Sequence, residues 1–584
     1  MTHQELCAKY ARLLLGLLAV SMLAAVPSGF AQNNPRANQS EVASGKHVQL
    51  DGVLEILNKD FKDHAEVSYT LKTSDGKRVP MHFAKQPPTH FLTGDHVQAE
   101  GDLSNNTLVL YSGSNVKSGG NGGTTPPTPS TGPLPYTLGT QYTLVILVNF
   151  QDDAVEPYTI SDVQAAYSGT VNDYVKEASY GQTSIVSTAV GWYTVPDSST
   201  TCDINQIATD ANNAATAAGV NLSSFTRYVY FFPYTSACAF AGASNVGGNP
   251  SQSWINGTVD PHVLDHELGH AFGLWHSHLL DCGTSATVCS GGNLVEYGDL
   301  IDTMGTVDSF APHYNTFQKE RLGWLNYGAS PPILTVQGSG TYTIQPYELE
   351  GSGPNALKIL QSTNSTTGAK TWYYLEARQA IGFDAFLTNG TCSACYGENE
   401  TTGVLFHLCT DGDSNSSDLI DMTPSTTTYY NWWDPSLAIG QSFTDSVAGA
   451  TFTVTSVGST GATVQITING SSTTSGSLTT SVTTNQSSYL PGQTVGVTVS
   501  VFSGSSPAAG VNVSATVMNP NGKSTTLNGT TGSTGTVLLT YKLSKSAPAG
   551  TYAIGASAKS STSPSSSTSG AAATTSANAS FTVQ

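Results

Sequence analysis

The chain has 584 residues, with 22 Lys and Arg against 41 Asp and Glu, and so a formal net charge of −19. The electrostatic field of a chain with this negative charge repels a polyanion, which argues against general nucleic-acid binding. The 38% of hydrophobic and 9% of aromatic residues suffice for packed cores and argue against global disorder. The length corresponds to about three to five domains.

The N-terminus has the pattern of a secretory signal peptide. Lys9 and Arg12 precede the apolar run of residues 13–26, and small residues follow it. This run has fourteen residues, whereas a transmembrane helix needs about 20. We therefore expect a signal peptide over residues 1–31 and a secreted, extracellular protein with no membrane span.

Residues 45–112 consist of short segments in which apolar and polar residues alternate. Turn-forming pairs such as Asp75-Gly76 and Asn105-Asn106 separate these segments, which is typical of antiparallel strands. We expect a small β-barrel-like or sandwich domain here. A Gly/Pro/Thr-rich linker follows over residues 113–137.

Residues 138–330 mix strand and helix signals. The apolar run of residues 143–150 has the length of a buried strand, and residues 161–179 after it repeat apolar side chains at helical spacing. A second strand-like run covers residues 226–234. This mixture predicts a single α+β domain.

Beyond residue 330 the signals are again those of β-structure. We expect a β-sandwich over residues 331–470, a linker over 471–480 and an immunoglobulin-like sandwich over 481–584. Asp445 is the last acidic residue, and the 139 residues after it carry four Lys and no carboxylate. This contrast indicates an appended module, for which an extracellular matrix or a cell surface is the expected partner.

Seven cysteines remain once the signal region is removed. In an oxidising compartment they indicate disulfides rather than a zinc site. Sequence proximity predicts these pairs, with one thiol left over: Cys202 with Cys238, Cys282 with Cys289, and Cys409 with Cys392 or Cys395.

The segment DPHVLDHELGHAFGLWHSH, residues 260–278, carries the chemistry. Asp260 suits a helix cap and Pro261 a first helical position, so a helix is predicted to begin here. Four-residue spacing places His266 and His270 on one helical face, where both imidazoles can bind one Zn²⁺.

A third ligand has to come from chain that is no longer helical. Gly273 can adopt a positive φ and end the helix, which returns His276 to the same ion. Glu267 then lies beside the metal, as a general base for a zinc-activated water. The complete pattern HExxHxxGxxH is far more specific than HExxH alone.

This pattern resembles the metzincin zinc endopeptidases, which add a Met-containing turn beneath the metal. The candidate turn is residues 302–305, with Met304 as the structural floor of the site. Together with FQKERLGWL and WYYLEAR, these residues look most like the gametolysin-like secreted metallopeptidases. The resemblance covers approximately residues 138–470. It implies a metzincin-like α+β catalytic domain over residues 138–330, flanked by all-β domains, and hydrolysis of extracellular proteins.

Two flanking histidines and one glutamate compete for the metal. A fourth protein ligand would close the site, so His262 and His278 are expected to lie outside the ligand set. Glu296 is the alternative third ligand of a thermolysin-like site, while Gly273 and His276 favour the metzincin arrangement.

Some metzincins carry a tyrosine two residues after the Met. That position is Thr306 here, so either Tyr297 or Tyr314 would have to take the role, and a packing role is the alternative for both.

Two acidic segments are further candidate sites. Asp411, Asp413, Asn415 and Asp418 have alternating oxygen donors that suit Ca²⁺, but the segment lacks the Gly and distal Glu of an EF-hand, which favours a solvated turn. Asp95 resembles the zinc-blocking aspartate of astacin zymogens with a spacing that is off by one, so a turn is expected there.

We therefore predict a secreted zinc metalloendopeptidase in which Glu267 moves the proton from water to the leaving amine. The alternative is a non-catalytic adhesion or matrix-binding protein with a vestigial protease domain. Whether residues 45–112 are an inhibitory propeptide stays open.

Overall fold

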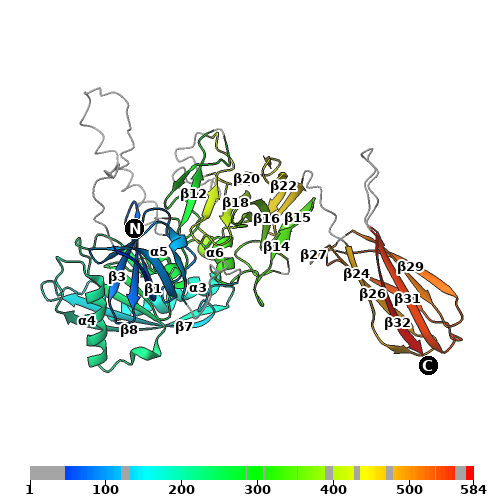
Figure 1. Ribbon diagram of the computed structural model, residues 1–584, viewed down its shortest axis with the longest axis horizontal. Helices are drawn as coiled ribbons and strands as arrows, with labels where there is room; N and C mark the ends of the chain where they lie inside the picture. Colours follow the sequence, from blue (N-terminus) through cyan, green and yellow to red (C-terminus); the bar gives the residue numbers. More distant parts are fainter. Residues whose placement is uncertain are drawn as a thin grey trace. The chain divides into compact units, whose positions relative to one another are not determined.

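The computed structural model describes residues 46–119, 132–284, 286–306, 310–351, 353–387, 399–426, 434–468, 478–503, 506–508, 510–532, 534–559 and 574–584 (Figure 1). They form two compact units. Residues up to 54, 69–88 and 96–119 make the first, and all other described residues make the second. No helix in these ranges is long and apolar enough to cross a membrane.

The first unit is built from antiparallel and parallel strand pairs. Its strands are β1 (Lys46–Asp60, of which residues 46–54 belong here), β2 (Ala65–Thr73), β3 (Arg78–Phe83), β4 (His96–Ser104), β5 (Thr107–Leu110) and β6 (Val116–Ser118). A one-turn 3₁₀ helix, Gly113–Asn115, precedes β6. β1 pairs with β4 from Lys46↔Leu103 to Val53↔His96, which completes a ring of pairings. The ring is not a barrel, so the predicted barrel-like domain is wrong.

The strands nearest the histidine motif have the order β10-β11-β9-β7-β8, and β1 continues their sheet beyond β10. These strands are β7 (Gly139–Phe150), β8 (Thr183–Val195), β9 (Arg227–Phe232), β10 (Gly242–Asn245) and β11 (Ser251–Asn256). All neighbours pair in parallel except β10, which is antiparallel to β11. The helices are α2 (Ile160–Ala166), α3 (Asn172–Ala178), α4 (Ile204–Ala217), α5 (Pro261–Phe272) and α6 (Thr316–Arg321), with a π segment at Tyr167–Val171 and a 3₁₀ turn at Leu222–Ser224.

The apolar run in β7 is buried on both faces, as expected for a central parallel strand. Val145 and Leu147 face a core shared with α3 and α5. Leu144 and Ile146 face the opposite core, which contains α4. Alternate side chains of one strand thus anchor helices on both faces of the sheet.

A second sheet crosses the domain boundary predicted at residue 330. Its order is β13 (Asn293–Val295), β12 (Ser277–Asp281), β19 (Ser417–Ile420), β18 (Gly403–Thr410), β17 (Lys370–Glu376), β16 (Ala356–Thr363) and β14 (Ile333–Val336), with β20 (Leu437–Ala438) beside β18. β12 follows the histidine motif and pairs in parallel with β19. The chain after the motif is therefore part of the downstream sheet.

A four-stranded sheet packs against this one around a shared aromatic and aliphatic core. Its order is β15 (Gly340–Ile344), β23 (Gly461–Ile468), β22 (Ala450–Gly458) and β21 (Ser442–Asp445). A 3₁₀ turn, Gly382–Asp384, lies between β17 and β18.

The C-terminal residues form two sheets around a core of Val, Ala and aromatic side chains. One contains β24 (Leu478–Thr484), β26 (Thr494–Ser503), β27 (Ser506–Pro507) and β30 (Thr536–Lys542). The other has the order β25 (Ser488–Tyr489), β32 (Thr574–Val583), β31 (Gly550–Lys559), β28 (Asn512–Met518) and β29 (Ser524–Thr530). An immunoglobulin-like fold is not shown for them.

The predicted fold class is wrong. The described residues are mostly β-structure, about 45% strand in several sheets and 13% helix, and a metzincin-like α+β domain is not shown. Helices are short, with 12 residues in α5 and 7 each in α2 and α3. Helical spacing in residues 161–179 was a correct local signal, but strand pairing between distant segments dominates the architecture.

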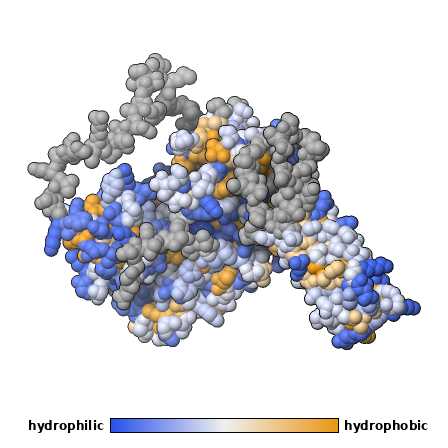
Figure 2. All heavy atoms as spheres, turned by 45° about the vertical axis from the view of Figure 1, so that its right-hand side comes forward, coloured by the Kyte–Doolittle hydropathy of each residue, from blue (hydrophilic) through white to orange (hydrophobic). Residues whose placement is uncertain are grey.

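Two of the predicted disulfides are confirmed, Cys202–Cys238 and Cys282–Cys289. Cys409 is a buried free thiol, so its predicted pairing is not found, and Cys392 and Cys395 lie outside the described residues. On the face shown in Figure 2, hydrophilic and mixed surface separates several hydrophobic patches, in keeping with a chain that has only 11% charged residues.

Candidate metal centre

The histidine motif lies on α5 and the turn that follows it. The Asp260 carboxylate accepts a hydrogen bond from the amide of His262 at 3.0 Å, and Pro261 is the first helical residue. The helix ends at Phe272 because Gly273 has φ +105°, a left-handed conformation that side chains with a Cβ disfavour. Both ends match the bounds predicted from the caps.

The three imidazoles of the motif converge through their Nε2 atoms. Nε2 of His276 lies 3.2 Å from Nε2 of His266 and 3.1 Å from Nε2 of His270. A tetrahedral ion with Zn–N bonds of 2.0–2.1 Å separates its nitrogen ligands by about 3.4 Å. All three rings are at most 4% exposed, so the donor set and its spacing fit one metal ion.

The second nitrogen of each ring is bound to an oxygen on its far side. Nδ1 of His266 lies 2.8 Å from the carbonyl of Thr303, and Nδ1 of His270 lies 2.9 Å from the carbonyl of Leu274. Carbonyls only accept, so these Nδ1 atoms carry the proton. The Nε2 atoms then carry the lone pairs that a metal can bind. In this structure the side-chain amide of Asn58 lies 2.9 Å from Nε2 of His270 and 3.2 Å from Nε2 of His276.

Nδ1 of His276 contacts the Glu296 carboxylate. The other carboxylate oxygen of Glu296 lies 3.4 Å from Nε2 of His278, whose Nδ1 lies 3.6 Å from Asp418. Burial raises the pKa of Glu296, but the two histidines outweigh this effect and lower it. Glu296 thus lies behind His276, and the structure does not place it with the Nε2 group.

Asp60 is the fourth member of the cluster, and sequence reasoning missed it. Its carboxylate oxygens lie 2.8 Å from Nε2 of His276, 3.4 Å from that of His270 and 3.5 Å from that of His266. In the part of the chain that the structure describes, these four residues are the one group arranged to hold a metal ion.

The pKa of Asp60 responds to two opposing effects. Burial raises it, but the nearby histidines, with His276 first, lower it well below its ordinary value. The Asp60 side chain is therefore ionised, and the ionised carboxylate is the form that binds a metal.

A sequence signal for Asp60 does exist. Along β1 the side chains of Leu54, Ile56, Asn58 and Asp60 share the buried phase of a period-two strand. Two polar residues that continue an apolar alternation are unusual, because a buried polar group needs a partner. The polar residues at these buried positions of the strand single out Asp60, but the sequence does not show that its partners are the three histidines.

Glu267 lies beside the cluster and is 2% exposed. Its Oε2 atom has no hydrogen-bond partner among the described residues. Burial, followed by the negative charge of Asp60, raises the pKa of Glu267 well above its ordinary value. The side chain lies against β10, where a Cβ on Gly242 would collide with its carboxylate.

Met304 lies under α5. The thioether is fully buried, and a Cβ on Gly269 would collide with its sulfur. The neighbouring carbonyl of Thr303 is the acceptor for His266 and also lies 3.2 Å from Nε2 of His262. The turn thus positions a ligand ring through the backbone and fills the space below the helix through Met304.

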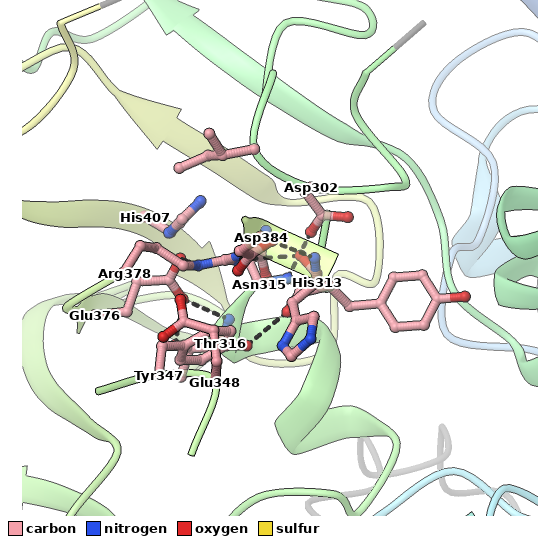
Figure 3. A network of polar contacts seen from close by, with 12 residues as sticks. Asp302, His313, Asn315, Thr316, Tyr347, Glu348, Glu376, Arg378, Asp384 and His407 are labelled. Atoms are coloured by element: carbon pink, nitrogen blue, oxygen red, sulfur yellow. Dashed lines mark hydrogen bonds and ion pairs between the residues drawn. The ribbon is translucent and has the colours of Figure 1, made fainter. Parts of the chain in front are cut away.

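Asp302, from the turn that carries Met304, belongs to a network of polar side chains that also includes Asn315, Arg378 and Asp384 (Figure 3). Asp302 accepts hydrogen bonds from the amides of Met304 at 2.6 Å and Asn315 at 2.8 Å. Arg378 reaches Asp384 at 2.7 Å, and both side chains are fully buried. The side-chain amide of Asn315 donates to the Ser417 hydroxyl on β19 at 2.7 Å, so Asn315 links the turn to the downstream sheet.

The two tyrosine candidates, Tyr297 and Tyr314, have different hydrogen-bond partners. The Tyr297 hydroxyl donates to Asp60 at 2.7 Å, whereas the Tyr314 hydroxyl donates to the carbonyl of Asp265 in the core. Tyr297 has φ +54°, a conformation that a bulky residue adopts only where its surroundings impose it. Tyr297 is therefore at the cluster, and Tyr314 supports α5.

A cavity of about 530 Å³ opens beside Glu267 and His266. Aromatic side chains of Tyr234 and Phe240 contribute to its wall, as does Tyr297. This volume is in the range of ligand-binding clefts.

The acidic segments predicted as alternatives do not form a site. Asp413 accepts from the Thr89 hydroxyl at 2.8 Å, Asp411 from the indole of Trp372 at 2.9 Å, and Asp418 faces His278. Their carboxylates are thus turned to separate partners rather than to one Ca²⁺. Asp95 accepts from the amide of Leu92 at 2.8 Å, as a turn residue does.

Comparison with solved structures gives low overall similarity. Metalloproteinase-II from Bacteroides fragilis is 13% identical with a TM-score of 0.23, covering 34% of this chain and 55% of that one. A tetra-tandem repeat of a large adhesion protein is 17% identical with a TM-score of 0.15, covering 40% and 51%. A DUF4785 family protein from Legionella pneumophila is 16% identical with a TM-score of 0.15, covering 21% and 32%.

The chain thus spans about a third to just over half of the length of these three proteins, and at these TM-scores they define no fold for it. No curated protein matches the chain. The gametolysin peptidase M11 family matches residues 152–393, a range that contains the three histidines, Glu267 and Met304. This match indicates a metallopeptidase hydrolase in this part of the chain.

Proposed function

We propose that this metallopeptidase is a secreted, zinc-dependent endopeptidase that hydrolyses peptide bonds of extracellular proteins. The observation that carries the proposal is the convergence of three Nε2 atoms with the Glu267 carboxylate beside them. The apolar segment near the N-terminus and the two disulfides support export.

Zinc is the metal that this donor set favours. Three neutral imidazoles and one carboxylate, His266, His270, His276 and Asp60, suit Zn²⁺ better than the oxygen-seeking Ca²⁺ or Mg²⁺. When bound, zinc supplies a water of lowered pKa and polarises the scissile carbonyl. The HExxHxxGxxH pattern supports a metzincin type of metal site.

Glu267 is the proposed general base. Its carboxylate lies at the edge of the cavity and is held against the backbone of Gly242, with Oε2 available to accept a proton. After the carboxylate has accepted a proton from water, burial stabilises the protonated form until the proton is delivered to the amide nitrogen. The three histidines keep their Nδ1 protons on fixed acceptors and so stay in one orientation.

The test is the variant Glu267→Gln. The amide has nearly the same shape but cannot accept the proton, so the protein should keep its metal and lose nearly all hydrolysis of casein or gelatin. Glu156→Gln, at an exposed position of the same region, is the matched control. Substantial activity in Glu267→Gln at full zinc content would refute the role of this residue.

A non-catalytic adhesion protein is the alternative class, but no contact among the described residues favours it. The metal-binding side chains are buried and mutually oriented, which a vestigial site has no need to maintain. Proteolysis that a chelator abolishes and Zn²⁺ restores separates the two hypotheses.

A further inference from the structure

The last residues of β1 form an added strand at the edge of the metal-site sheet. β10 is the edge strand of the order β10-β11-β9-β7-β8, and residues 57–60 pair with it antiparallel, from Leu57↔Asn245 to Asp60↔Gly242. The amide of Ala241 continues the ladder by donating to the Asp60 carbonyl at 2.9 Å. An extended segment therefore occupies the sheet edge that lies beside Glu267, in the way that a bound peptide adds a strand.

This strand is fixed by contacts independent of any metal. The Thr93 hydroxyl bonds to the Ile56 backbone at both its carbonyl, 2.9 Å, and its amide, 3.0 Å. The amide of Val246 donates to the Ile56 carbonyl at 3.0 Å. Residues 55–68 and 89–95 belong to the unit that contains the histidines, whereas residues 69–88, between these two segments, belong to the first unit.

The carboxylate at the end of the strand is itself held in place. The side-chain amide of Asn58 donates to the two Asp60 oxygens at 2.9 and 3.1 Å. Tyr297 donates to one of them at 2.7 Å. Asp60 is 7% exposed, so its position next to three Nε2 atoms is built by the surrounding chain.

Residues 61 and 62 follow along the cavity. Phe61, Lys62 and Asp60 all line the space beside Glu267. The ring of Phe61 packs edge-on against Phe240 with 6.4 Å between centroids. The segment therefore occupies both the sheet edge and part of the wall next to the general base.

We propose that Asp60 is a fourth metal ligand and that residues 57–62 hold the protein in a latent state. This rests on the proposed zinc peptidase function. A catalytic zinc site has three protein ligands and an open position for water, whereas four protein ligands make a closed site. With Asp60 bound, the position for water is filled and the edge of β10 is closed to an extended substrate. Activity then requires that this segment leave the site.

The test compares metal access with and without the Asp60 carboxylate, in the full chain. The variants are Asp60→Ala and the near-isosteric Asp60→Asn, and the control is Asp63→Ala, because the Asp63 side chain is 86% exposed in the same segment. The probe is acetohydroxamate, which binds an accessible Zn²⁺ or Co²⁺ through two oxygens. These measurements use the Glu267→Gln background, in which the chain cannot process itself.

The expected result is that both Asp60 variants keep one metal ion on the three histidines. They should bind acetohydroxamate at least about tenfold more tightly than the parent, since a blocked site lowers apparent affinity by the fraction that is open. The visible absorption of the Co²⁺-loaded variants should change on adding the probe, while the parent and Asp63→Ala should not respond. With Glu267 restored, Asp60→Ala should hydrolyse casein once limited proteolysis has removed residues 57–62 from the β10 edge.

Two results would overturn latency. Equal acetohydroxamate affinity in the parent and in both Asp60 variants would show that the carboxylate does not block the metal. Loss of the metal from both variants would make Asp60 a permanent ligand. Tighter probe binding in Asp60→Ala with no hydrolysis even after proteolytic removal of residues 57–62 would leave latency standing and refute the peptidase function instead.

Discussion

The Glu296 carboxylate binds Nδ1 of His276, the nitrogen opposite the Nε2 atom that faces the metal cluster. This contact fixes the orientation and the tautomer of a ligand ring. It also explains why Glu296 is a poor candidate for the third ligand, since both of its oxygens are taken by His276 and His278.

The first prediction concerns Glu296→Gln. The amide is a weaker acceptor for the His276 proton, so the zinc affinity should fall by about 10- to 100-fold while the ligand set stays complete. Competition with a chelator measures the affinity, and Glu350→Gln, at an exposed position, is the control. If instead the Gln variant lost all zinc and His276→Ala retained it, Glu296 would be the ligand and the present assignment would be wrong.

A second prediction follows from the glycine on β10 that faces the general base. In Gly242→Ala the new methyl would collide with the Glu267 carboxylate, so the base should move while the histidines stay in place. We expect hydrolysis of a peptide to fall by roughly 100-fold or more, as for a lost general base, at unchanged zinc content. Gly169→Ala, where the added methyl meets nothing within 4 Å, is the control; equal activity in both variants would contradict the placement of Glu267.

The helix C-terminus gives a third prediction. Gly273→Ala puts a Cβ at φ +105°, which should destabilise the protein by roughly 1–2 kcal/mol. Gly219→Ala, at φ +90° with open space around it, carries the same backbone cost away from the metal. Both variants should lower the thermal midpoint, but only Gly273→Ala should also weaken zinc binding, because the turn at Gly273 returns His276 to the cluster. A zinc affinity lowered equally in both would remove the link between this turn and the site.

These residues also show what the sequence can and cannot reveal. The bounds of α5 follow from local rules, because an N-cap Asp260, Pro261 and a left-handed Gly273 act within a few residues of the helix they delimit. Convergence of His266, His270 and His276 follows from the same short range. All of these were predictable.

Asp60 was not predictable in the same way. It lies 206 residues before His266 in the chain, counting from the numbering, and reaches it only because residues 57–60 pair with β10. The same reason defeats the fold prediction, since the pairing of β12 with β19 joins two segments assigned to different domains. Strand partners depend on long-range packing that periodicity does not encode.

The last prediction concerns pH and the removal of zinc. Burial lowers the pKa of His276, but Asp60 and Glu296 outweigh it and raise the pKa to about 9 from 6.5. In the chelated protein this raised pKa stabilises the fold fully below pH 6.5, and the stabilisation is lost as the pH rises toward 9.

Zinc replaces that proton, so zinc should restore more stability at the upper end of this window than at its lower end. At each end of this pH window, every tenfold rise in free zinc above the dissociation constant should add about 1.4 kcal/mol to the free energy of unfolding.

Below pH 6.5 a second group, His270, affects stability. Burial lowers its pKa to about 4, so the free energy of unfolding falls as the pH drops from 6.5 toward 4. Thermal unfolding with and without a chelator at several pH values measures both effects. In His276→Ala, zinc should no longer raise the free energy of unfolding, and the increase of this effect toward pH 9 should disappear with it. A zinc-dependent stabilisation that persisted unchanged in this variant would place the metal elsewhere.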